Sequence, residues 1–186
     1  MKLNWLTNLE QAKEESQKSR KPILLQFEMD NCGGCKKLYE ETYTDEKVQE
    51  EMNQWFVLLK LDLKKDRDIR RELSGYWTPS FYFLDHNGKS YYNFNGYLPP
   101  DEFRLMLRIG YSESMIPKGK YDEVIDVINK DLQNFEEAAL FSKALVQKGI
   151  AEYIKTKDNP SFREKMKEIQ DKYPNSLEAK MYFWDE

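Results

Sequence analysis

Two cysteines lie three residues apart in the segment Cys32-Gly33-Gly34-Cys35, and the chain of 186 residues contains no others. A mostly apolar run before them, residues 23–27, predicts a buried strand, and apolar residues at helical spacing follow them. The pair therefore lies where a strand is predicted to enter a helix. Cysteines that served only as small buried hydrophobes would have no reason to occur together in one turn. This placement predicts that the pair is a chemical unit.

The predicted junction puts the Cys32 sulfur at a helix N-terminus, where unpaired N–H groups and the helix dipole stabilise a thiolate. The pKa of a thiol in such a place falls from about 8.5 to roughly 3.5 to 7.5. Gly33 and Gly34 carry no Cβ, so a substrate disulfide has room to approach Cys32. We therefore expect Cys32 to be the attacking thiol, and Cys35 to resolve the mixed disulfide that results.

Two other uses of the pair are open. A structural zinc ion needs four ligands, and the single histidine, His86, stands beside a predicted turn, so the site would need carboxylates or a second chain. A permanent disulfide across three residues closes a very short loop and constrains the unfolded chain little; an inert remnant is the further alternative. Redox chemistry by the dithiol itself is the leading interpretation, and it needs no metal and no organic cofactor.

The charge balance excludes some classes of partner. Lys and Arg total 29 against 33 Asp and Glu, so there is no excess of positive charge to bind nucleic acid or an anionic membrane. The first residues lack the apolar core of a signal peptide, and no segment approaches the roughly 18 apolar residues of a membrane span. We expect a cytoplasmic protein, since a reducing compartment suits a reactive dithiol.

The first part of the chain alternates helical and strand patterns. Helical patterns and start signals cover about residues 7–20, 33–42, 44–54, 66–74 and 101–109, and strand patterns cover 23–27, 55–63, 81–84 and 90–95. Helices between the first two strands imply parallel pairing, and the turn at Asn87-Gly88 predicts an antiparallel hairpin. The predicted fold class is α/β, with a central mixed sheet flanked by helices.

Thr78-Pro79 stands at the entrance of the third predicted strand. Because proline cannot donate to a strand ladder, Pro79 belongs at a strand end, and we expect a cis peptide bond there that faces the Cys32 sulfur.

With these features, residues 5–109 resemble the thioredoxin superfamily. The matching positions are Lys21-Pro22, Phe27, Cys32 to Cys35, Lys36, Asp62, Thr78-Pro79, the turn from Asp85 to Gly88, and Gly96. The resemblance implies a thioredoxin-like fold and thiol-disulfide exchange. It also implies that backbone groups beside a cis-proline hold the substrate peptide next to the sulfurs, a role that falls here to Thr78 and Pro79, with Gly96 beside them.

Three positions depart from the family pattern. Asn31 replaces the usual tryptophan before the first cysteine, and Gly33-Gly34 replaces the usual Gly-Pro. Gln26 takes the place of a buried acid that assists proton transfer, and we expect it to be a hydrogen-bonded buried amide. Because an amide cannot titrate, proton movement at Cys35 would then need water, Glu28 or another carboxylate.

Residues 111–186 show helical patterns only. Start signals near Tyr121, Asn134, Asn159 and Ser176 predict four helices in up-down order. Two of their turns are similar to those of tetratricopeptide repeats, although a 34-residue period is absent. We expect a core domain of residues 1–110 and a helical extension of residues 111–186. The extension is interpreted either as a cap packed on the core or as a protein-binding surface.

These features favour a thiol-disulfide oxidoreductase whose partners are protein disulfides and a recycling reductant. The alternative is a non-catalytic adaptor that binds a protein through the fold and the helical extension.

Overall fold

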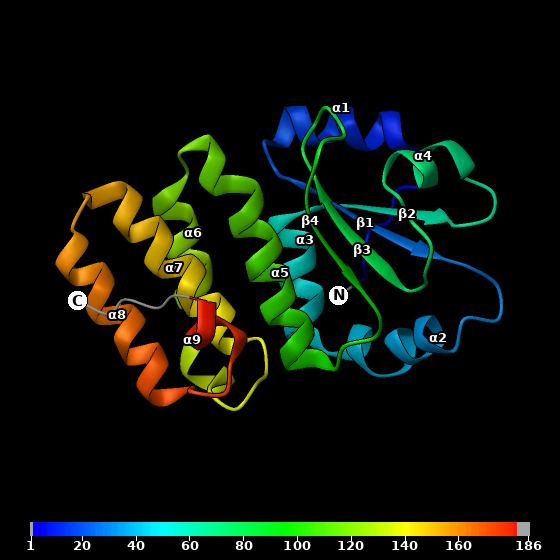
Figure 1. Cartoon of the computed structure of the whole chain (residues 1–186). Helices are drawn as coiled ribbons and strands as arrows, with labels where there is room; N and C mark the ends of the chain where they lie inside the picture. Colours follow the sequence, from blue (N-terminus) through cyan, green and yellow to red (C-terminus); the bar gives the residue numbers. More distant parts are fainter. Residues whose placement is uncertain (1, 182–186) are drawn as a thin grey trace. The chain divides into compact units, whose positions relative to one another are not determined.

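In a computed structural model, which describes residues 2–181, four strands form one mixed sheet (Figure 1). The strands are β1 (Ile23–Glu28), β2 (Val57–Asp62), β3 (Ser80–Leu84) and β4 (Ser90–Asn95), in the order β2-β1-β3-β4. β1 pairs with β2 in parallel, while β3 is antiparallel to both β1 and β4. The predicted fold class, with its parallel pair and its hairpin, is confirmed.

Helices surround this sheet. They are α1 (Leu9–Ser19), α2 (Gly33–Glu40), α3 (Glu46–Trp55), α4 (Arg67–Glu72) and α5 (Pro100–Met115), with a 3-10 turn η1 (Thr42–Thr44) after α2. Side-chain caps begin three of them: Asn8 accepts from the N–H of Gln11, Cys32 from that of Cys35, and Asp45 from that of Val48. The element order matches the prediction, and α1 begins one residue late because Asn8 rather than Thr7 is its cap.

The two faces of the sheet carry different helices. Alternate residues of β1, Ile23, Leu25 and Phe27, pack with Ala12 of α1 in one apolar cluster, which also includes residues of β2 and β3 and is flanked by α4. On the opposite face Phe81 and Tyr43 each pack edge-to-face against Phe103 of α5. In Figure 1, α1 and α4 lie on one side of the sheet, and α2, α3 and α5 lie on the other. The second side is the one that positions the cysteines.

A buried ion cluster joins α3 to α5. Glu51 is 1 % exposed and receives two hydrogen bonds from each of Arg104 and Arg108, at 2.6 to 3.1 Å. Both arginines are buried as well, and the Arg108 guanidinium lies 5.0 Å from the Trp55 ring centroid. Because all three charges have left water, the cluster is stable only as a unit.

α5 continues six residues beyond its predicted end at Ile109. Gly110 lies inside the helix, where a Cβ would stand 2.2 Å from the Phe83 ring. The glycine therefore lets the helix approach the sheet and does not terminate it. Further along, Tyr111 packs against Trp55 and Phe56. Trp55 is itself the last residue of α3, although its apolar surroundings predicted a strand start there.

The contacts divide the chain into two compact units, Met1–Ser114 and Met115–Glu186. Within the second unit the described elements are a 3-10 turn η2 (Ile116–Lys118), α6 (Tyr121–Asn129), a 3-10 turn η3 (Leu132–Phe135), α7 (Phe141–Thr156), α8 (Asn159–Lys172) and α9 (Leu177–Met181). Asn134 lies in η3 and caps no α-helix, contrary to the prediction, and Asp158 rather than Asn159 caps α8.

A small apolar cluster joins α7 to α8 in the second unit: Val146, Phe162, Met166 and Ile169. A Cβ on Gly149 would lie 2.9 Å from the Met166 side chain, so this glycine permits the close packing of the two helices. Tyr182, Phe183 and Trp184, aromatic residues of the extension that we expected to cover the core domain or to line a groove, lie outside the described residues. Among residues 2–181, no helix is long and apolar enough to cross a membrane.

Candidate functional site

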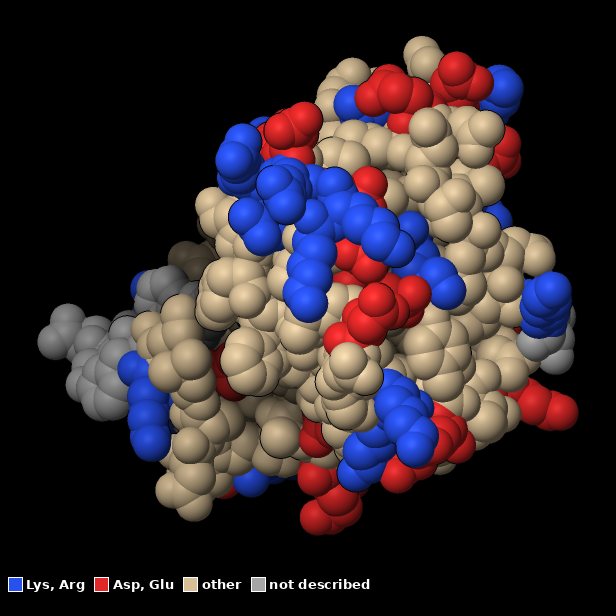
Figure 2. All heavy atoms as spheres, turned by 90° about the vertical axis from the view of Figure 1, so that its right-hand side faces the viewer, with Lys and Arg blue, Asp and Glu red and all other residues tan. Residues whose placement is uncertain are grey.

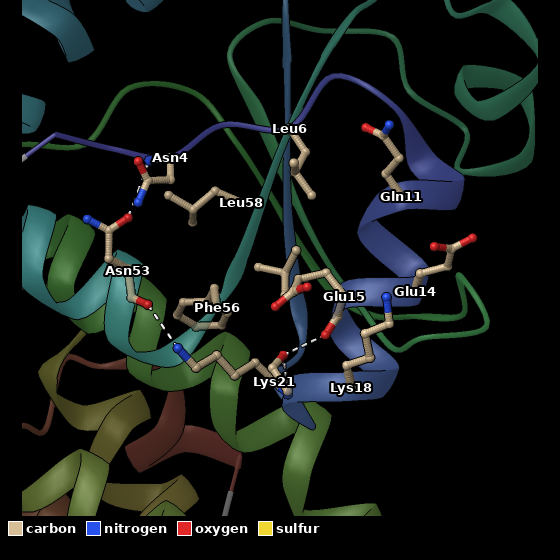
Figure 3. A pocket seen from close by; sticks show the side chains of 12 residues that line it. Asn4, Leu6, Gln11, Glu14, Glu15, Lys18, Lys21, Asn53, Phe56 and Leu58 are labelled. Atoms are coloured by element: carbon tan, nitrogen blue, oxygen red, sulfur yellow. Dashed lines mark hydrogen bonds between the residues drawn. The ribbon is translucent and has the colours of Figure 1, made fainter.

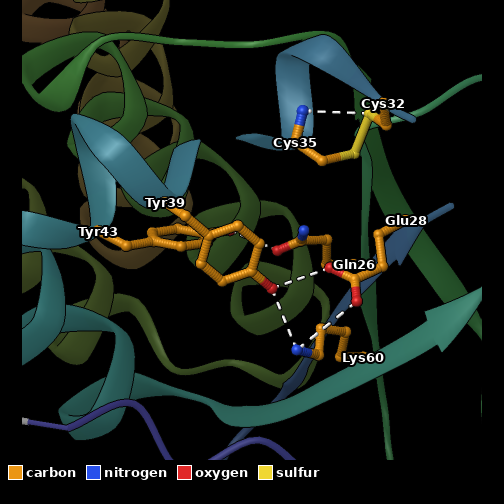
Figure 4. The surroundings of a disulfide bond; sticks show 7 residues. All are labelled: Gln26, Glu28, Cys32, Cys35, Tyr39, Tyr43 and Lys60. Atoms are coloured by element: carbon orange, nitrogen blue, oxygen red, sulfur yellow. Dashed lines mark hydrogen bonds and ion pairs between the residues drawn. A yellow bond between two sulfur atoms is a disulfide. The ribbon is translucent and has the colours of Figure 1, made fainter. Parts of the chain in front are cut away.

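Cys32 and Cys35 form a disulfide at the start of α2, with their Cα atoms 5.2 Å apart (Figure 4). The strand β1 ends at Glu28, and a short loop carries the chain to Cys32, the N-cap residue of α2. The Cys32 sulfur accepts a hydrogen bond of 3.1 Å from the N–H of Cys35. This is the N-terminal position that the sequence predicted for the first sulfur.

The two sulfurs differ in their access to solvent. Cys35 is 6 % exposed, whereas Cys32 is half-buried. A reaction partner in solution therefore reaches Cys32 first. The N–H of Cys35 donates to the Cys32 sulfur, and the sulfur lies at the positive end of the α2 dipole, so both favour negative charge on it when the disulfide is reduced.

The other predicted site residues are assembled around the same turn. A Cβ on Gly34 would lie 2.8 Å from Cδ of Pro79, so the proline ring packs directly against the backbone between the two cysteines. The Thr78-Pro79 peptide bond is cis. The carbonyl of Pro79 accepts a 2.8 Å hydrogen bond from the N–H of Gly96, which has a φ of 116° that favours glycine.

Thr78 completes this group. Its side chain is 8 % exposed, and its Oγ1 has no hydrogen-bond partner among the described residues. The structure therefore brings Cys32, Cys35, Thr78, Pro79 and Gly96 together. Segments that are far apart in the sequence supply them: the start of α2, the entrance of β3 and the end of β4.

Gln26 is fully buried on β1, below the cysteine helix (Figure 4). Its Oε1 accepts a hydrogen bond from the hydroxyl of Tyr43, while its Nε2 has no partner among the described residues. Burial raises the pKa of Tyr43 well above its usual value, so this hydroxyl remains a donor. The amide expected at this position is thus only half satisfied.

The next side chain after Gln26 on the same face of β1 is a carboxylate, that of Glu28. Glu28 accepts a 2.8 Å hydrogen bond from the Tyr39 hydroxyl, which in turn accepts a 3.1 Å bond from Lys60 (Figure 4). Lys60 also lies 3.6 Å from the other Glu28 oxygen. Burial, and then the hydrogen bond and charge of Glu28, raise the pKa of Tyr39. Tyr39 therefore stays protonated and holds Glu28 in place.

An open pocket of about 540 Å³ contains both cysteines. It is lined by Glu28, Met29, Asp30, Asn31, Cys32, Gly33, Cys35, Lys36, Tyr39 and Asp62. Partial burial opposes ionisation of Asp62, but hydrogen bonds from the N–H groups of Lys65 and Lys64, with the charges of those lysines, lower its pKa below the usual value. Asp62, Glu28 and Tyr39 thus line the same pocket as the disulfide, and Lys60 holds Glu28 and Tyr39 from outside the lining.

Sequence reasoning missed the Tyr39 and Lys60 part of this network. Tyr39 had the helical spacing of an inward residue, yet it is 41 % exposed. Lys60 lies beside Gln26 in the β1–β2 register, and that register appears only once the strands are paired. Helical spacing from Cys35 to Tyr39, four residues, was the one available signal that Tyr39 shares the site.

A different pocket, of about 420 Å³, lies between α1 and β2 (Figure 3). Lys21 crosses it and donates a 3.1 Å hydrogen bond to the carbonyl of Asn53, whose side chain accepts from the N–H of Asn4. No cysteine lines this pocket. Among residues 2–181, no group of three or more His, Cys, Asp and Glu side chains is arranged to hold a metal ion.

Residues 9–109, more than half of the chain, match the family model of the thioredoxin-like domain. The chain therefore belongs to the thioredoxin-like family, as the motifs predicted. The matched range contains all five site residues named above and ends before the second unit. The resemblance of that unit to tetratricopeptide repeats stays a prediction.

Known relatives agree with this assignment. Over 103 residues the chain is 31 % identical to the thiol:disulfide interchange protein DsbD of Campylobacter jejuni, strain RM1221. The alignment covers 53 % of this chain and 18 % of the relative, so the chain spans less than a fifth of that protein's length.

Solved structures show the same fold. A putative disulphide-isomerase from Bacteroides thetaiotaomicron has a TM-score of 0.53 and 22 % identity, over 59 % of this chain and 92 % of that one. A thioredoxin from Thermus thermophilus has a TM-score of 0.52 and 21 % identity, over 58 % and 86 % of the two chains.

Proposed function

We propose that the protein is a thiol-disulfide oxidoreductase that exchanges disulfides with protein substrates through Cys32 and Cys35. The observation that carries the proposal is the position of the pair. The more accessible sulfur caps a helix, the second is buried behind it, and Pro79 packs against the turn between them. The family assignment and the name of the Campylobacter relative support the same chemistry.

The reaction proceeds in two displacements. The Cys32 thiolate attacks one sulfur of the substrate disulfide, the substrate S–S bond breaks, and one substrate sulfur leaves as a thiolate. The Cys35 thiol then loses its proton and attacks the Cys32 sulfur, and the second substrate sulfur leaves and takes up that proton. Two electrons pass to the substrate, and the protein is left with the Cys32–Cys35 disulfide. A dithiol reductant must then restore the reduced pair.

Proton transfer at Cys35 needs an acceptor other than Gln26. Glu28 lines the same pocket as both cysteines and is held by Tyr39 and Lys60. It is the carboxylate that we assign to this step, with water between the two groups where they do not touch. Because the fold supplies the dithiol and the carboxylate from its own side chains, the proposed exchange requires no other cofactor.

Insulin reduction with dithiothreitol as electron source tests the proposal. The wild-type protein should accelerate the precipitation of insulin chains, and Cys32→Ser should not. If the two proteins are equally slow, the alternative of a non-catalytic adaptor becomes the better account. That the reaction takes place in the cytoplasm stays a prediction from the sequence.

A further inference from the structure

Two consecutive aromatic side chains are exposed immediately before the site. Tyr76 is 74 % exposed and Trp77 is 56 % exposed, while the other large apolar side chains that are exposed among residues 2–181 are Tyr39, Leu177 and Met181. A protein gains nothing in folding from rings left in water, and exposed aromatic pairs are enriched where proteins bind one another. The exposure of these two rings therefore has a reason other than packing in the core.

The aromatic pair is linked to the disulfide site through the short chain segment that leads to Pro79. Trp77 precedes Pro79 by two residues, which span about 7 Å of chain, and Pro79 packs against Gly34 between the cysteines. Between Trp77 and Pro79 stands Thr78, whose buried Oγ1 has no partner among the described residues. A chain that approached the cysteines along this loop would pass over the exposed rings of Tyr76 and Trp77.

The loop leads directly away from a basic helix. The N–H of Gly75 donates a 2.8 Å hydrogen bond to the carbonyl of Arg70, and a Cβ on Gly75 would lie 3.3 Å from Cγ of Arg70. Residues 64–72, which include α4, hold five basic residues (Lys64, Lys65, Arg67, Arg70 and Arg71) and three acidic ones (Asp66, Asp68 and Glu72). Figure 2 shows basic side chains gathered on the upper part of the face where α4 lies. This local excess is positive in a chain whose net charge is −4.

We propose that Tyr76 and Trp77, with the basic side chains of α4, form a docking surface for the polypeptide that carries the substrate disulfide. The surface fits a segment with an apolar side chain next to its cysteine and acidic residues further along. This inference rests on the proposed function, because it names the substrate class for that site.

A single-turnover assay tests the surface. The probes are cysteine peptides linked through a disulfide to thionitrobenzoate, so that attack by the reduced protein releases a coloured thiolate. Four peptides combine Leu or Ser beside the cysteine with a Glu-rich or Lys-rich tail, and Ellman's reagent alone is the small disulfide. The readout is the rate constant for each peptide divided by that for Ellman's reagent. For the wild-type protein this ratio should be about tenfold higher for the peptide with Leu and a Glu-rich tail than for the peptide with Ser and a Lys-rich tail, because the leucine is partly buried on the rings.

Variants separate the two parts of the surface. Trp77→Ala should remove the preference for Leu, Trp77→Phe should keep most of it, and Arg71→Glu should remove the preference for Glu. Leu177→Ala and Lys18→Glu make matched changes on other exposed side chains and should leave the ratios at their wild-type values. Equal ratios for all four peptides with the wild-type protein, or an unchanged Leu preference in Trp77→Ala, would overturn the inference. Failure of the wild-type protein to react with any disulfide would instead overturn the proposed function.

Discussion

Gly33 and Gly34 look equivalent in the sequence but have different surroundings. A Cβ on Gly33 has no heavy atom within 4 Å, whereas a Cβ on Gly34 would lie 2.8 Å from Pro79. Only Gly34 is therefore needed for the contact between the cysteine helix and the proline loop. A Cβ at Gly33 would lie in open space and is expected to be tolerated.

Gly34→Ala should displace Pro79 and lower the rate constant for exchange with a peptide disulfide by about 10- to 100-fold, because a shift of about 1 Å at a reactive site has effects of this size. Gly33→Ala is the control and should retain nearly the wild-type rate. The rates can be compared by release of thionitrobenzoate from a peptide disulfide. Loss of activity in both variants, or in neither, would show that the contact with Pro79 does not position the site.

Cys32 should be the more acidic thiol of the reduced protein. It caps α2 and is the more accessible sulfur, so its folded pKa should lie below the ~8.5 of a free thiol, and the thiolate should persist as the pH falls toward that lower value. Alkylation by iodoacetamide across pH, followed by mass spectrometry, should label Cys32 before Cys35. Earlier labelling of Cys35 would reverse the roles assigned to the two sulfurs.

At this scale the sequence predicted that the cysteine pair, Thr78, Pro79 and Gly96 belong to one site, because their spacing and residue types fit a known family pattern; their roles in exchange and substrate binding stay predictions. It could not identify the Tyr39–Glu28–Lys60 network, since that network depends on which residues of β1 and β2 lie side by side. Gln26 was correctly expected to be buried, but its contacts could not be predicted. The Tyr43 hydroxyl donates to its Oε1, and its Nε2 has no partner among the described residues.

At the scale of elements, the strands and helices were predicted in their correct order, while several boundaries were not. Trp55 and Phe56 are adjacent and both buried, so apolarity alone could not decide where α3 ends and β2 begins. Gly110 is a helix breaker by propensity, yet the close approach of α5 to Phe83 requires it. Tertiary packing decided both boundaries.

The ion cluster between α3 and α5 gives a prediction about stability. Glu51→Gln would leave Arg104 and Arg108 buried without their shared carboxylate. The free energy of unfolding should fall by about 3 to 5 kcal/mol, as when one partner of a buried ion pair is removed. Urea denaturation of the variant would measure the change.

Glu50→Gln is the matched control, because its side chain is exposed on the same helix, and it should change the free energy of unfolding by about 0.5 kcal/mol or less. Equal midpoints for the Glu51 and Glu50 variants would mean that the cluster contributes little to the packing of α5 on α3.

At the scale of the whole molecule, the predicted boundary after Gly110 falls inside α5, whereas the compact units meet at Ser114 and Met115. A chain that ends at Gly110 loses the ring of Tyr111 from Trp55 and Phe56. A chain that ends at Gly119 keeps this ring. The shorter truncation therefore tests the contacts of Tyr111, and the longer one tests whether the first unit folds without the second.

We expect the chain of residues 1–119 to fold and to retain exchange activity. The chain of residues 1–110 should be less stable than it by about 3 kcal/mol or more, the usual cost of removing a buried aromatic side chain. Thermal unfolding followed by circular dichroism would compare the two. Identical midpoints would contradict the assigned role of Tyr111, and failure of residues 1–119 to fold would show that the first unit depends on the second.

Trapping the reaction half-way tests the central claim most directly. Reduced Cys35→Ser protein, mixed with a protein disulfide and analysed by mass spectrometry, should accumulate a mixed disulfide on Cys32, because no second thiol remains to resolve it. Cys32→Ser should accumulate none at comparable times. A mixed disulfide that forms on Cys35 as readily as on Cys32, or on neither, would contradict the proposal that Cys32 at the start of α2 exchanges disulfides with protein substrates.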